Sequence, residues 1–231
     1  MLRYLVQTGA STYRPVLLVL SLIAIASMLV GNVLALLQDN VKRLLAYSSI
    51  AQLGYLLVAL VAGGPRAAEA VTYYMVAYMV TTLCAFGSVT VLSGKTADAD
   101  AIEAYRGLFW RRPGVAVVLA VALLSLAGMP FTAGFVGKLY VLAAGVESAL
   151  WLLVVLVVCN SALGLFYYLR LVVMMCAPLS PEAVVPTAGL ARSWSWAGGV
   201  ALAALTGLLV GLGVYPAPLL AMIRMTVASL H

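Results

Sequence analysis

The chain has 231 residues, of which 65% are hydrophobic and 9% are charged, and its formal net charge is +6 at pH 7. A mean hydropathy of +1.12 excludes a soluble globular domain, because so few polar residues cannot cover a surface exposed to water. The basic residues stand singly at the ends of apolar segments, which is typical of membrane topology signals and argues against nucleic acid as a partner.

Six apolar stretches are long enough to cross a bilayer, which takes about 20 helical residues. They are residues 15–37, 41–62, 69–93, 113–146, 149–177 and 194–214. The fourth stretch is longer than one straight crossing needs, which predicts an unwound or kinked middle. The sequence therefore predicts an all-α polytopic bundle in which one helix is broken at about 127–134.

The basic residues also predict the orientation, because cytoplasmic loops collect Lys and Arg. One side of the predicted bundle has eight cations and the other has four. The larger set is Lys42, Arg43, Lys95, Arg106, Arg111, Arg112, Arg170 and Arg192, and the smaller set is Arg3, Arg14, Arg66 and Arg224. We expect loop 94–112 to be cytoplasmic, with a surface or partner-docking role, and both termini to face outward.

The predicted break places a lysine inside the membrane. Gly128, Pro130, Thr132 and Gly134 interrupt the fourth apolar stretch, because proline loses a helical hydrogen bond and clashes with the preceding turn. Lys138 follows one turn later. A charge at this depth costs at least about 2.5 to 3.5 kcal/mol and usually marks a proton or ion path. The alternative is a snorkelling anchor, but the end of the segment lies roughly 12 Å away at helical rise.

Further polar residues lie in the other spans. Ser48, Gln52 and Tyr55 share one face of the second span, where interhelical hydrogen bonding and a water-lined path are both open interpretations. The third span has Tyr73, Tyr74 and Tyr78 near one end, a pattern typical of an interfacial belt, although Tyr78 and Thr82 could also line a hydrated seam.

The fifth span carries Asn160 and Ser161 midway, where small and amide side chains favour close helix packing. Arg170 lies near its cytoplasmic end, as an anchor or as a functional residue. In the sixth span Gly207 and Gly211 have the GxxxG spacing that is typical of tight packing. We take Thr132, Asn160 and Arg170, with the polar residues of the second and third spans, as candidates that line a path to Lys138.

No other chemistry is indicated. The three cysteines lie in or beside apolar segments, the single histidine is the last residue, and there is no CxxC, P-loop or dinucleotide motif. We therefore expect no metal or cofactor site in this chain. Every carboxylate falls at a helix end or in a loop, so either Lys138 lacks a counter-ion and releases its proton readily, or another polypeptide supplies the acid.

Three motifs carry a resemblance to a known family. They are NVKRLLAYSSIAQLGYLLVAL, DADAIEAYRGLFWRRP and LSLAGMPFTAGFVGKLYVL. Over about residues 29–175 the chain resembles the subunit N family of the proton-pumping NADH:quinone oxidoreductase, bacterial complex I. The wider group of antiporter-like subunits, including those of sodium/proton antiporters, shares the first and third motifs in looser form, and YRGLFWRRP favours subunit N.

The resemblance implies an inner-membrane subunit without a redox centre, which moves protons while NADH, flavin, iron–sulfur clusters and quinone react in other subunits. It implies that residues 1–177 form a five-helix repeat, that 178–231 hold a closing helix and a tail, and that Lys138 is the lysine of the broken helix. Other membrane subunits and the lipid bilayer are the implied partners.

The chain also departs from the family. Full-length relatives have further helices upstream, so this sequence corresponds to about half a subunit, as a truncated or split product or a fragment. Many relatives have a histidine where this chain has Gln52. An antiporter subunit and an inert structural subunit are the alternative functions.

Overall fold

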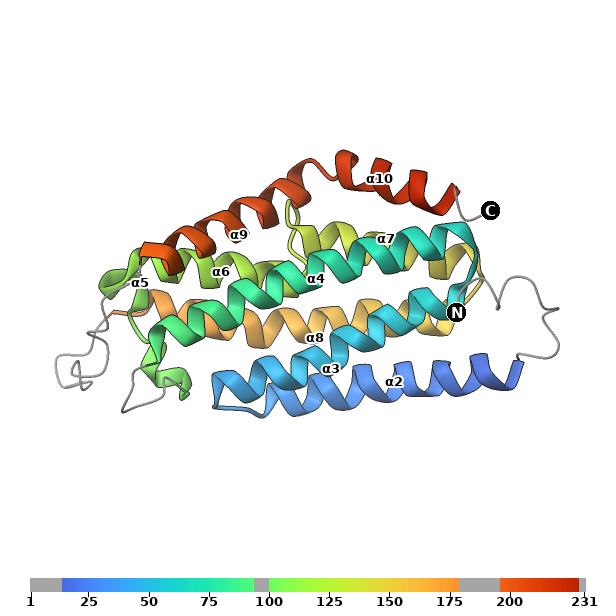
Figure 1. Cartoon of the computed structure of the whole chain (residues 1–231). Helices are drawn as coiled ribbons and strands as arrows, with labels where there is room; N and C mark the ends of the chain where they lie inside the picture. The colour runs from blue at the N-terminus through green and yellow to red at the C-terminus, as the bar shows by residue number, and fades with distance from the viewer. Residues whose placement is uncertain (1–13, 94–99, 179–195, 229–231) are drawn as a thin grey trace.

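The computed structural model describes residues 14–93, 100–178 and 196–228, and over these ranges the chain is helical with no strand (Figure 1). The long helices are α2 (Arg14–Leu36), α3 (Val41–Ala62), α4 (Gly64–Leu92) and α8 (Trp151–Cys176). The shorter elements are η1 (Ile102–Tyr105), α5 (Leu108–Arg111), α6 (Pro113–Ala127), α7 (Ala133–Glu147), α9 (Trp196–Val214) and α10 (Ala217–Ala228).

The helix lengths confirm an all-α polytopic membrane fold. Among the described residues, α2, α3, α4 and α8 are each long and apolar enough to cross a membrane. The sixth predicted span ends at Val214 as expected: α9 has 19 residues, and α10 turns away from it by 77°. Pro216 and Pro218 lie at this bend, where proline stops the preceding helix.

The fourth predicted span is broken. In Figure 1 helices α6 and α7 follow one another along the bundle, separated by the segment from Gly128 to Thr132. Pro130 lies inside this segment, and Phe131 takes a left-handed conformation with φ 67°. Gly134, which the sequence assigned to the break, instead lies in the first turn of α7.

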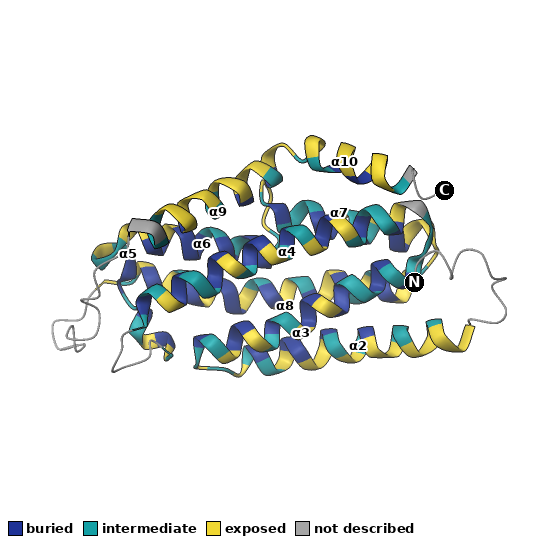
Figure 2. Ribbon diagram, in the orientation of Figure 1, coloured by how far each residue is buried: buried dark blue, intermediate teal, exposed yellow. Residues whose placement is uncertain are grey.

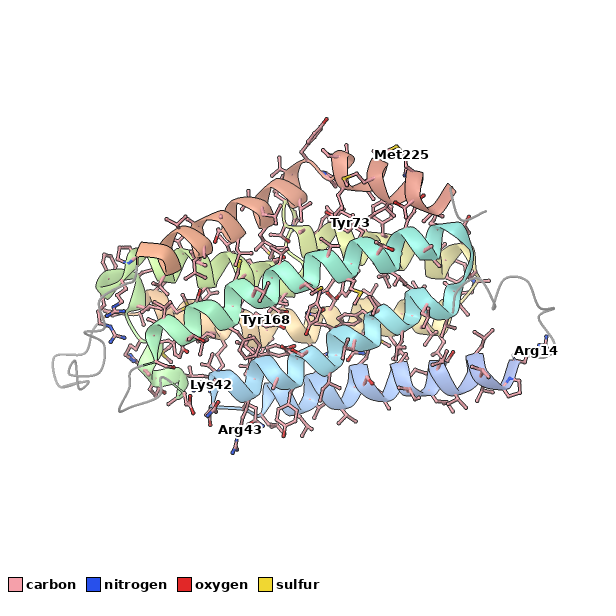
Figure 3. All side chains as sticks on the ribbon, in the orientation of Figure 1. Arg14, Lys42, Arg43, Tyr73, Tyr168 and Met225 are labelled. Carbon is pink, nitrogen blue, oxygen red and sulfur yellow. The ribbon has the colours of Figure 1, made fainter. Side chains whose placement is uncertain are left out.

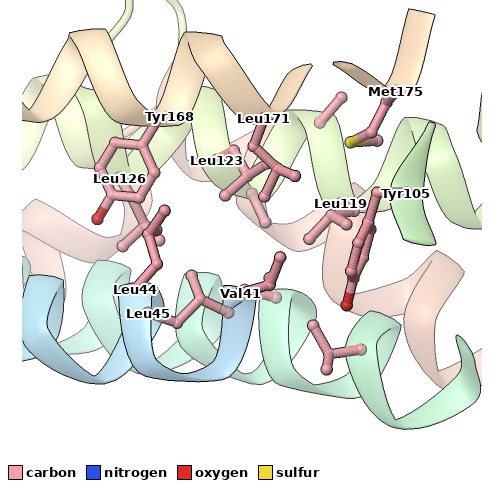
Figure 4. Packing of buried hydrophobic residues seen from close by; sticks show 14 of the residues in the cluster. Val41, Leu44, Leu45, Tyr105, Leu119, Leu123, Leu126, Tyr168, Leu171 and Met175 are labelled. Atoms are coloured by element: carbon pink, nitrogen blue, oxygen red, sulfur yellow. The ribbon is translucent and has the colours of Figure 1, made fainter. Parts of the chain in front are cut away.

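The core is divided among several clusters rather than gathered in one layer (Figure 2). Helix α4 runs through the middle and contacts α3, α6, α7, α9 and α10. Figure 4 shows the largest cluster, in which Leu44 and Leu45 of α3, Leu119 and Leu123 of α6, and Leu171 of α8 pack together. Burial of these aliphatic side chains holds α6, the first half of the broken helix, against α3, α4 and α8, while Val141 and Ala144 of α7 are buried in a second cluster with α2, α3, α4 and α8.

The described part of the long loop packs onto the bundle through backbone hydrogen bonds and apolar side chains. The backbone N–H of Val41 donates to the Asp100 carbonyl, and that of Ile102 donates to the Asp39 carbonyl at 2.9 Å. Ile102, Tyr105 and Leu108 are buried in the core. The Lys42 ammonium, 2.8 Å from Asp100 Oδ1, lowers the pKa of that carboxyl below its ordinary value. Residues 94–99 lie outside the described residues.

The cations separate into the two predicted sets. Figure 3 shows Arg14 at one end of the bundle, and Lys42 and Arg43 at the other. Arg66 and Arg224 pair with Glu147 and Glu69, each at 3.2 Å. Arg3, Lys95 and Arg192 lie outside the described residues.

Two sequence interpretations are wrong. Tyr73 and Tyr74 do not form an interfacial belt, because both are buried and their hydroxyls donate to the Leu212 carbonyl and to Gln52 Oε1. Buried tyrosine is tolerated when its hydroxyl finds such a partner. Gly207 and Gly211 do not mediate tight packing against the described residues of this chain, since a Cβ at either position would meet none of them within 4 Å.

Candidate functional site

The end of α6 creates a group of free carbonyl oxygens inside the bundle. The last carbonyls of a helix have no partner within it. Gly128 has φ 84°, a left-handed conformation that glycine adopts without a Cβ penalty, and its N–H donates to the carbonyls of Leu124 and Ser125. The N–H of Met129 also donates to the Leu124 carbonyl. The carbonyls of Leu126 and Ala127 are left to other donors.

Lys138 fills this position from α7. Its side chain is buried, with 6% exposure, and its Nζ donates to the carbonyls of Leu126 at 2.9 Å and Ala127 at 3.0 Å. A third bond runs to Ser161 Oγ on α8 at 3.0 Å. Three acceptors match the three N–H bonds of an ammonium group. Nζ also lies 5.2 Å from the centroid of the Tyr55 ring, within the range of a cation–π contact.

Within the described residues, the negative charge that faces Lys138 comes from a helix end. Carbonyl groups at a helix C-terminus carry the negative end of the helix dipole, which favours a cation. Among the described residues, every salt bridge involves carboxylates outside this site: Asp39, Glu69, Asp100 and Glu147. The structure thus places Lys138 in a cradle of neutral oxygens.

The break places Lys138 within reach of this cradle. Thr132 caps α7 by accepting the N–H of Phe135, and its hydroxyl donates to the Met129 carbonyl at 2.7 Å. Thr132 therefore shapes the break rather than contacting the lysine. Gly134 lets α7 press against α6, because a Cβ there would lie 1.9 Å from the Ser125 carbonyl oxygen.

Gln52 and Tyr55 from α3 join the site. Gln52 Nε2 donates to the Leu126 carbonyl at 3.0 Å, and Gln52 Oε1 accepts from the Tyr74 hydroxyl of α4. Tyr55 supplies the ring beside Nζ. Ser48, on the same face, donates to the Leu45 carbonyl of its own helix at 2.8 Å.

Asn160 belongs to a second polar cluster, between α2, α3 and α8. Asn32 Nδ2 lies 3.1 Å from Asn160 Oδ1 and 3.3 Å from the Tyr55 hydroxyl. The Tyr167 hydroxyl donates to Asn32 Oδ1 at 2.9 Å. Tyr55 thus connects this cluster to the Lys138 site, because its hydroxyl bonds Asn32 and its ring lies beside Lys138 Nζ.

The remaining candidates are not among the hydrogen-bond partners of Nζ. Tyr78 lines a cavity of about 10 Å³ together with Gln52, Tyr74, Thr81 and Ser125. Thr82 follows Thr81 in the sequence but does not line this cavity, and its buried hydroxyl has no partner among the described residues. Arg170 is at the end of the bundle and pairs with Asp39 at 2.8 Å.

Comparison with known proteins decides the family. Residues 3–164 match the model of the family described as NADH:quinone oxidoreductase/Mrp antiporter, transmembrane. The chain belongs to this family. NADH-quinone oxidoreductase subunit N of Chromohalobacter salexigens is 52% identical over 213 residues, covering 91% of this chain and 44% of that protein. The resemblance read from the motifs is confirmed.

Solved structures agree with this family. Respiratory complex I from Thermus thermophilus with bound aureothin contains a chain 34% identical to this one, with a TM-score of 0.75, covering 88% of this chain and 44% of that one. The archaeal membrane-bound sulfane sulfur reductase contains one 26% identical, with a TM-score of 0.81 and coverages of 94% and 43%. The chain spans less than half the length of the relatives it matches.

For this member of the NADH:quinone oxidoreductase/Mrp antiporter family, four residues that shape the site are not among the path-lining candidates predicted from the sequence: Asn32, Tyr74, Ser161 and Tyr167. Ser161 directly follows Asn160, which is one of those candidates. Asn32 is a lone amide in an apolar helix, and a buried amide needs partners. That signal was available in the sequence. The carbonyls of Leu126 and Ala127 carry no side-chain signal at all.

Proposed function

We propose that this chain is a proton-translocating membrane subunit of an NADH:quinone oxidoreductase, in which Lys138 takes up and releases the transported proton. The observation that carries the proposal is the position of Lys138 Nζ, buried and bonded to the carbonyls of Leu126 and Ala127 at the break of a membrane-embedded helix. A buried lysine in a membrane span is expensive and usually functional.

The cradle can hold both protonation states of Lys138. As an ammonium, Nζ donates to three oxygens and faces the negative end of α6. As a neutral amine it has two donors and one lone pair, so one of the three contacts is lost. The Ser161 hydroxyl can then donate to the lone pair of Nζ, because a hydroxyl donates as well as accepts. In the structure this hydroxyl lies 3.4 Å from the Ala127 carbonyl oxygen. Neither state then leaves Nζ without partners.

The parent complex is inferred from the relatives. The name of the 52% identical relative specifies an NADH-quinone oxidoreductase. We therefore place the chain in the cell inner membrane with other membrane subunits, and assign NADH, flavin, iron–sulfur clusters and quinone to other subunits of the complex. The chain then couples to quinone reduction without a redox centre of its own. A sodium/proton antiporter subunit is the alternative, since the family includes both.

The proposed organisation follows the broken helix. We assign residues 1–177 to one antiporter-like repeat, whose described helices end with α8, and residues 178–231 to a closing segment with α9 and α10.

For orientation, we place loop 94–112 on the cytoplasmic side and the termini outside, because the larger set of cations lies with this loop. An impermeant thiol reagent should then label Ala99→Cys only from the cytoplasmic side, and Arg66→Cys only from the other side, in a chain without Cys159 and Cys176.

Two substitutions test the role of Lys138. Lys138→Ala removes the proton carrier, and Lys138→Arg keeps a charge that does not release its proton at accessible pH. Both variants should assemble, and both should translocate far fewer protons per NADH oxidised than the parent. Lys42→Ala is the matched control, because it removes a half-exposed lysine whose ion pair contributes little.

The measurement is proton translocation coupled to NADH oxidation in membranes carrying each variant, with subunit content determined alongside. If both Lys138 variants assemble and pump like the parent, Lys138 is an anchor and the proposal fails. Sodium-dependent proton exchange without coupling to NADH would instead identify the antiporter alternative.

A further inference from the structure

The outward face of the last turns of α8 forms an apolar groove at one end of the bundle. Its volume is about 450 Å³, and it is lined by Phe166, Leu169, Val173, Met174 and Ala177 together with Arg106 and Arg170. Phe166 and Val173 are 64% and 66% exposed. None of the residues that line the groove bonds to Lys138.

Two arginines lie among the residues that line the groove. Arg106 makes no ion pair within the described part of the chain. Arg170 uses one nitrogen, Nη2, to bond Asp39 at 2.8 Å, which leaves its other N–H groups to bond a ligand. Two arginines and one aspartate leave an excess of positive charge, and arginine forks match phosphate oxygens.

The backbone that carries Arg106 is held firmly. Arg111 Nη2 donates to the carbonyls of Ala104 at 2.8 Å and Arg106 at 2.7 Å, and the N–H of Gly107 donates to the Met174 carbonyl of α8 at 3.2 Å. The segment after η1 is therefore fastened to the helix that forms the floor of the groove. Arg106 is presented to the groove by a fixed turn.

A tryptophan marks the depth of this end in the membrane. Trp110 is 71% exposed, and its Nε1 donates to the Cys176 carbonyl in the last turn of α8 at 3.4 Å. Exposed tryptophan is enriched where lipid headgroups meet the hydrocarbon layer. Arg106 and Arg170 line the groove together with Met174 and Ala177 at the same end of α8, so their charges are at headgroup level while the apolar lining extends toward the bilayer interior.

We propose that this groove binds an anionic phospholipid. Its phosphate lies between Arg106 and Arg170, and an acyl chain lies along Leu169, Phe166 and Val173. The charge excess selects an anionic over a zwitterionic headgroup, and the apolar lining selects a lipid over a free anion. The inference does not depend on the proton-transfer role of Lys138.

The test uses Trp110 as the reporter. The full chain, with Trp151, Trp194 and Trp196 replaced by Phe, is reconstituted in phosphatidylcholine bilayers containing increasing brominated phosphatidylglycerol. Quenching of Trp110 fluorescence reports occupancy of the neighbouring groove. We expect phosphatidylglycerol to be preferred over brominated phosphatidylcholine by at least about fivefold, the effect of one basic side chain at the surface.

Matched variants assign the preference to the groove. Arg106→Gln should reduce it about fivefold without unfolding the chain, because the Arg106 side chain makes no ion pair within the described residues. Arg43→Gln removes an exposed cation at the same end of the bundle, outside the groove, and should leave the preference unchanged (Figure 3).

Several results would overturn the proposal. Equal quenching by both brominated lipids would show that headgroup charge is not recognised. An unchanged preference in Arg106→Gln would show that the preference for phosphatidylglycerol does not arise in the groove. Displacement by millimolar inorganic phosphate would indicate a free-anion site. Absence of quenching in the assembled complex would show that a partner protein covers the groove. Because no turnover is measured, none of these results depends on whether Lys138 carries protons.

Discussion

Gln52 and Lys138 donate hydrogen bonds to the same acceptor, the carbonyl oxygen of Leu126, at 3.0 and 2.9 Å. One donor comes from α3 and the other from α7, so the last turn of α6 joins both helices at the break. Gln52 in turn accepts from Tyr74 of α4. A change on α4 can therefore reach the lysine through two side chains and one carbonyl.

The first prediction concerns the bond between Gln52 and Tyr74. Gln52→Leu leaves the buried Tyr74 hydroxyl without its partner and should lower the free energy of unfolding by about 1 to 3 kcal/mol. Tyr74→Phe should cost a similar amount, because it leaves Gln52 Oε1 unpaired. The double variant should lose less than the sum of both, and the unfolding free energies of all four proteins in one detergent measure this coupling. Additive losses would show that the bond contributes nothing.

The second prediction concerns Gly128. Gly128→Ala places a side chain at φ 84°, which costs roughly 1 to 2 kcal/mol, and its Cβ would lie 3.0 Å from Lys138 Cδ and 3.1 Å from Nζ. The flexible lysine should yield and leave the carbonyls of Leu126 and Ala127. Proton translocation should fall more than stability alone explains.

Gly64→Ala is the control for Gly128→Ala. Gly64 has φ 79°, and a Cβ there would meet nothing within 4 Å, so the substitution carries the same backbone strain without touching Lys138. It should lose similar stability and keep its proton translocation. Equal translocation by both variants would mean that the position of Nζ in the cradle does not matter.

The helical architecture was predictable because hydropathy and helix breakers report it directly. Each long apolar run forms a helix, and Gly128 with Pro130 ends the α6 segment where the sequence predicted a break. Orientation and the role of Lys138 remain predictions. The partners of Lys138 were not predictable, because two of its three acceptors are backbone carbonyls, which every residue has.

Side-chain identity also misled the sequence analysis at Tyr73 and Tyr74. Tyrosine near a helix end suggests an interface, but its burial depends on which helices cover it. Tyr73 is covered by the C-terminal part of the chain, since Leu209, Leu220 and Ile223 pack in its cluster. No local pattern in α4 encodes that contact. Similarly, the spacing of Gly207 and Gly211 could not show that both face open space.

The third prediction concerns the contact between the two halves of the broken helix. Gly134→Ala would place its Cβ 1.9 Å from the backbone oxygen of Ser125, so α7 must move away from α6. We expect a loss of at least about 1 to 3 kcal/mol in unfolding free energy, the usual cost of overpacking. Gly211→Ala, in open space on α9, should instead be neutral or stabilising by up to about 1 kcal/mol. Similar stabilities for the two variants would contradict the tight contact.

The last prediction concerns Asn32, whose amide connects α2, α3 and α8. Asn32→Leu keeps the branched shape of the side chain but leaves the Tyr167 hydroxyl and Asn160 Oδ1 without a partner from α2, which should cost about 1 to 3 kcal/mol for each buried group. Adding Tyr167→Phe should recover part of this loss, because it removes one of the stranded groups. In a chain without the exposed Cys159 and Cys176, unfolding can be followed with a thiol-reactive dye at Cys84, which is buried in the folded chain. Thr72→Leu, whose exposed hydroxyl bonds only its own helix, is the control and should change the midpoint little. If Asn32→Leu unfolds at the same temperature as the parent, the amide cluster does not hold these helices together.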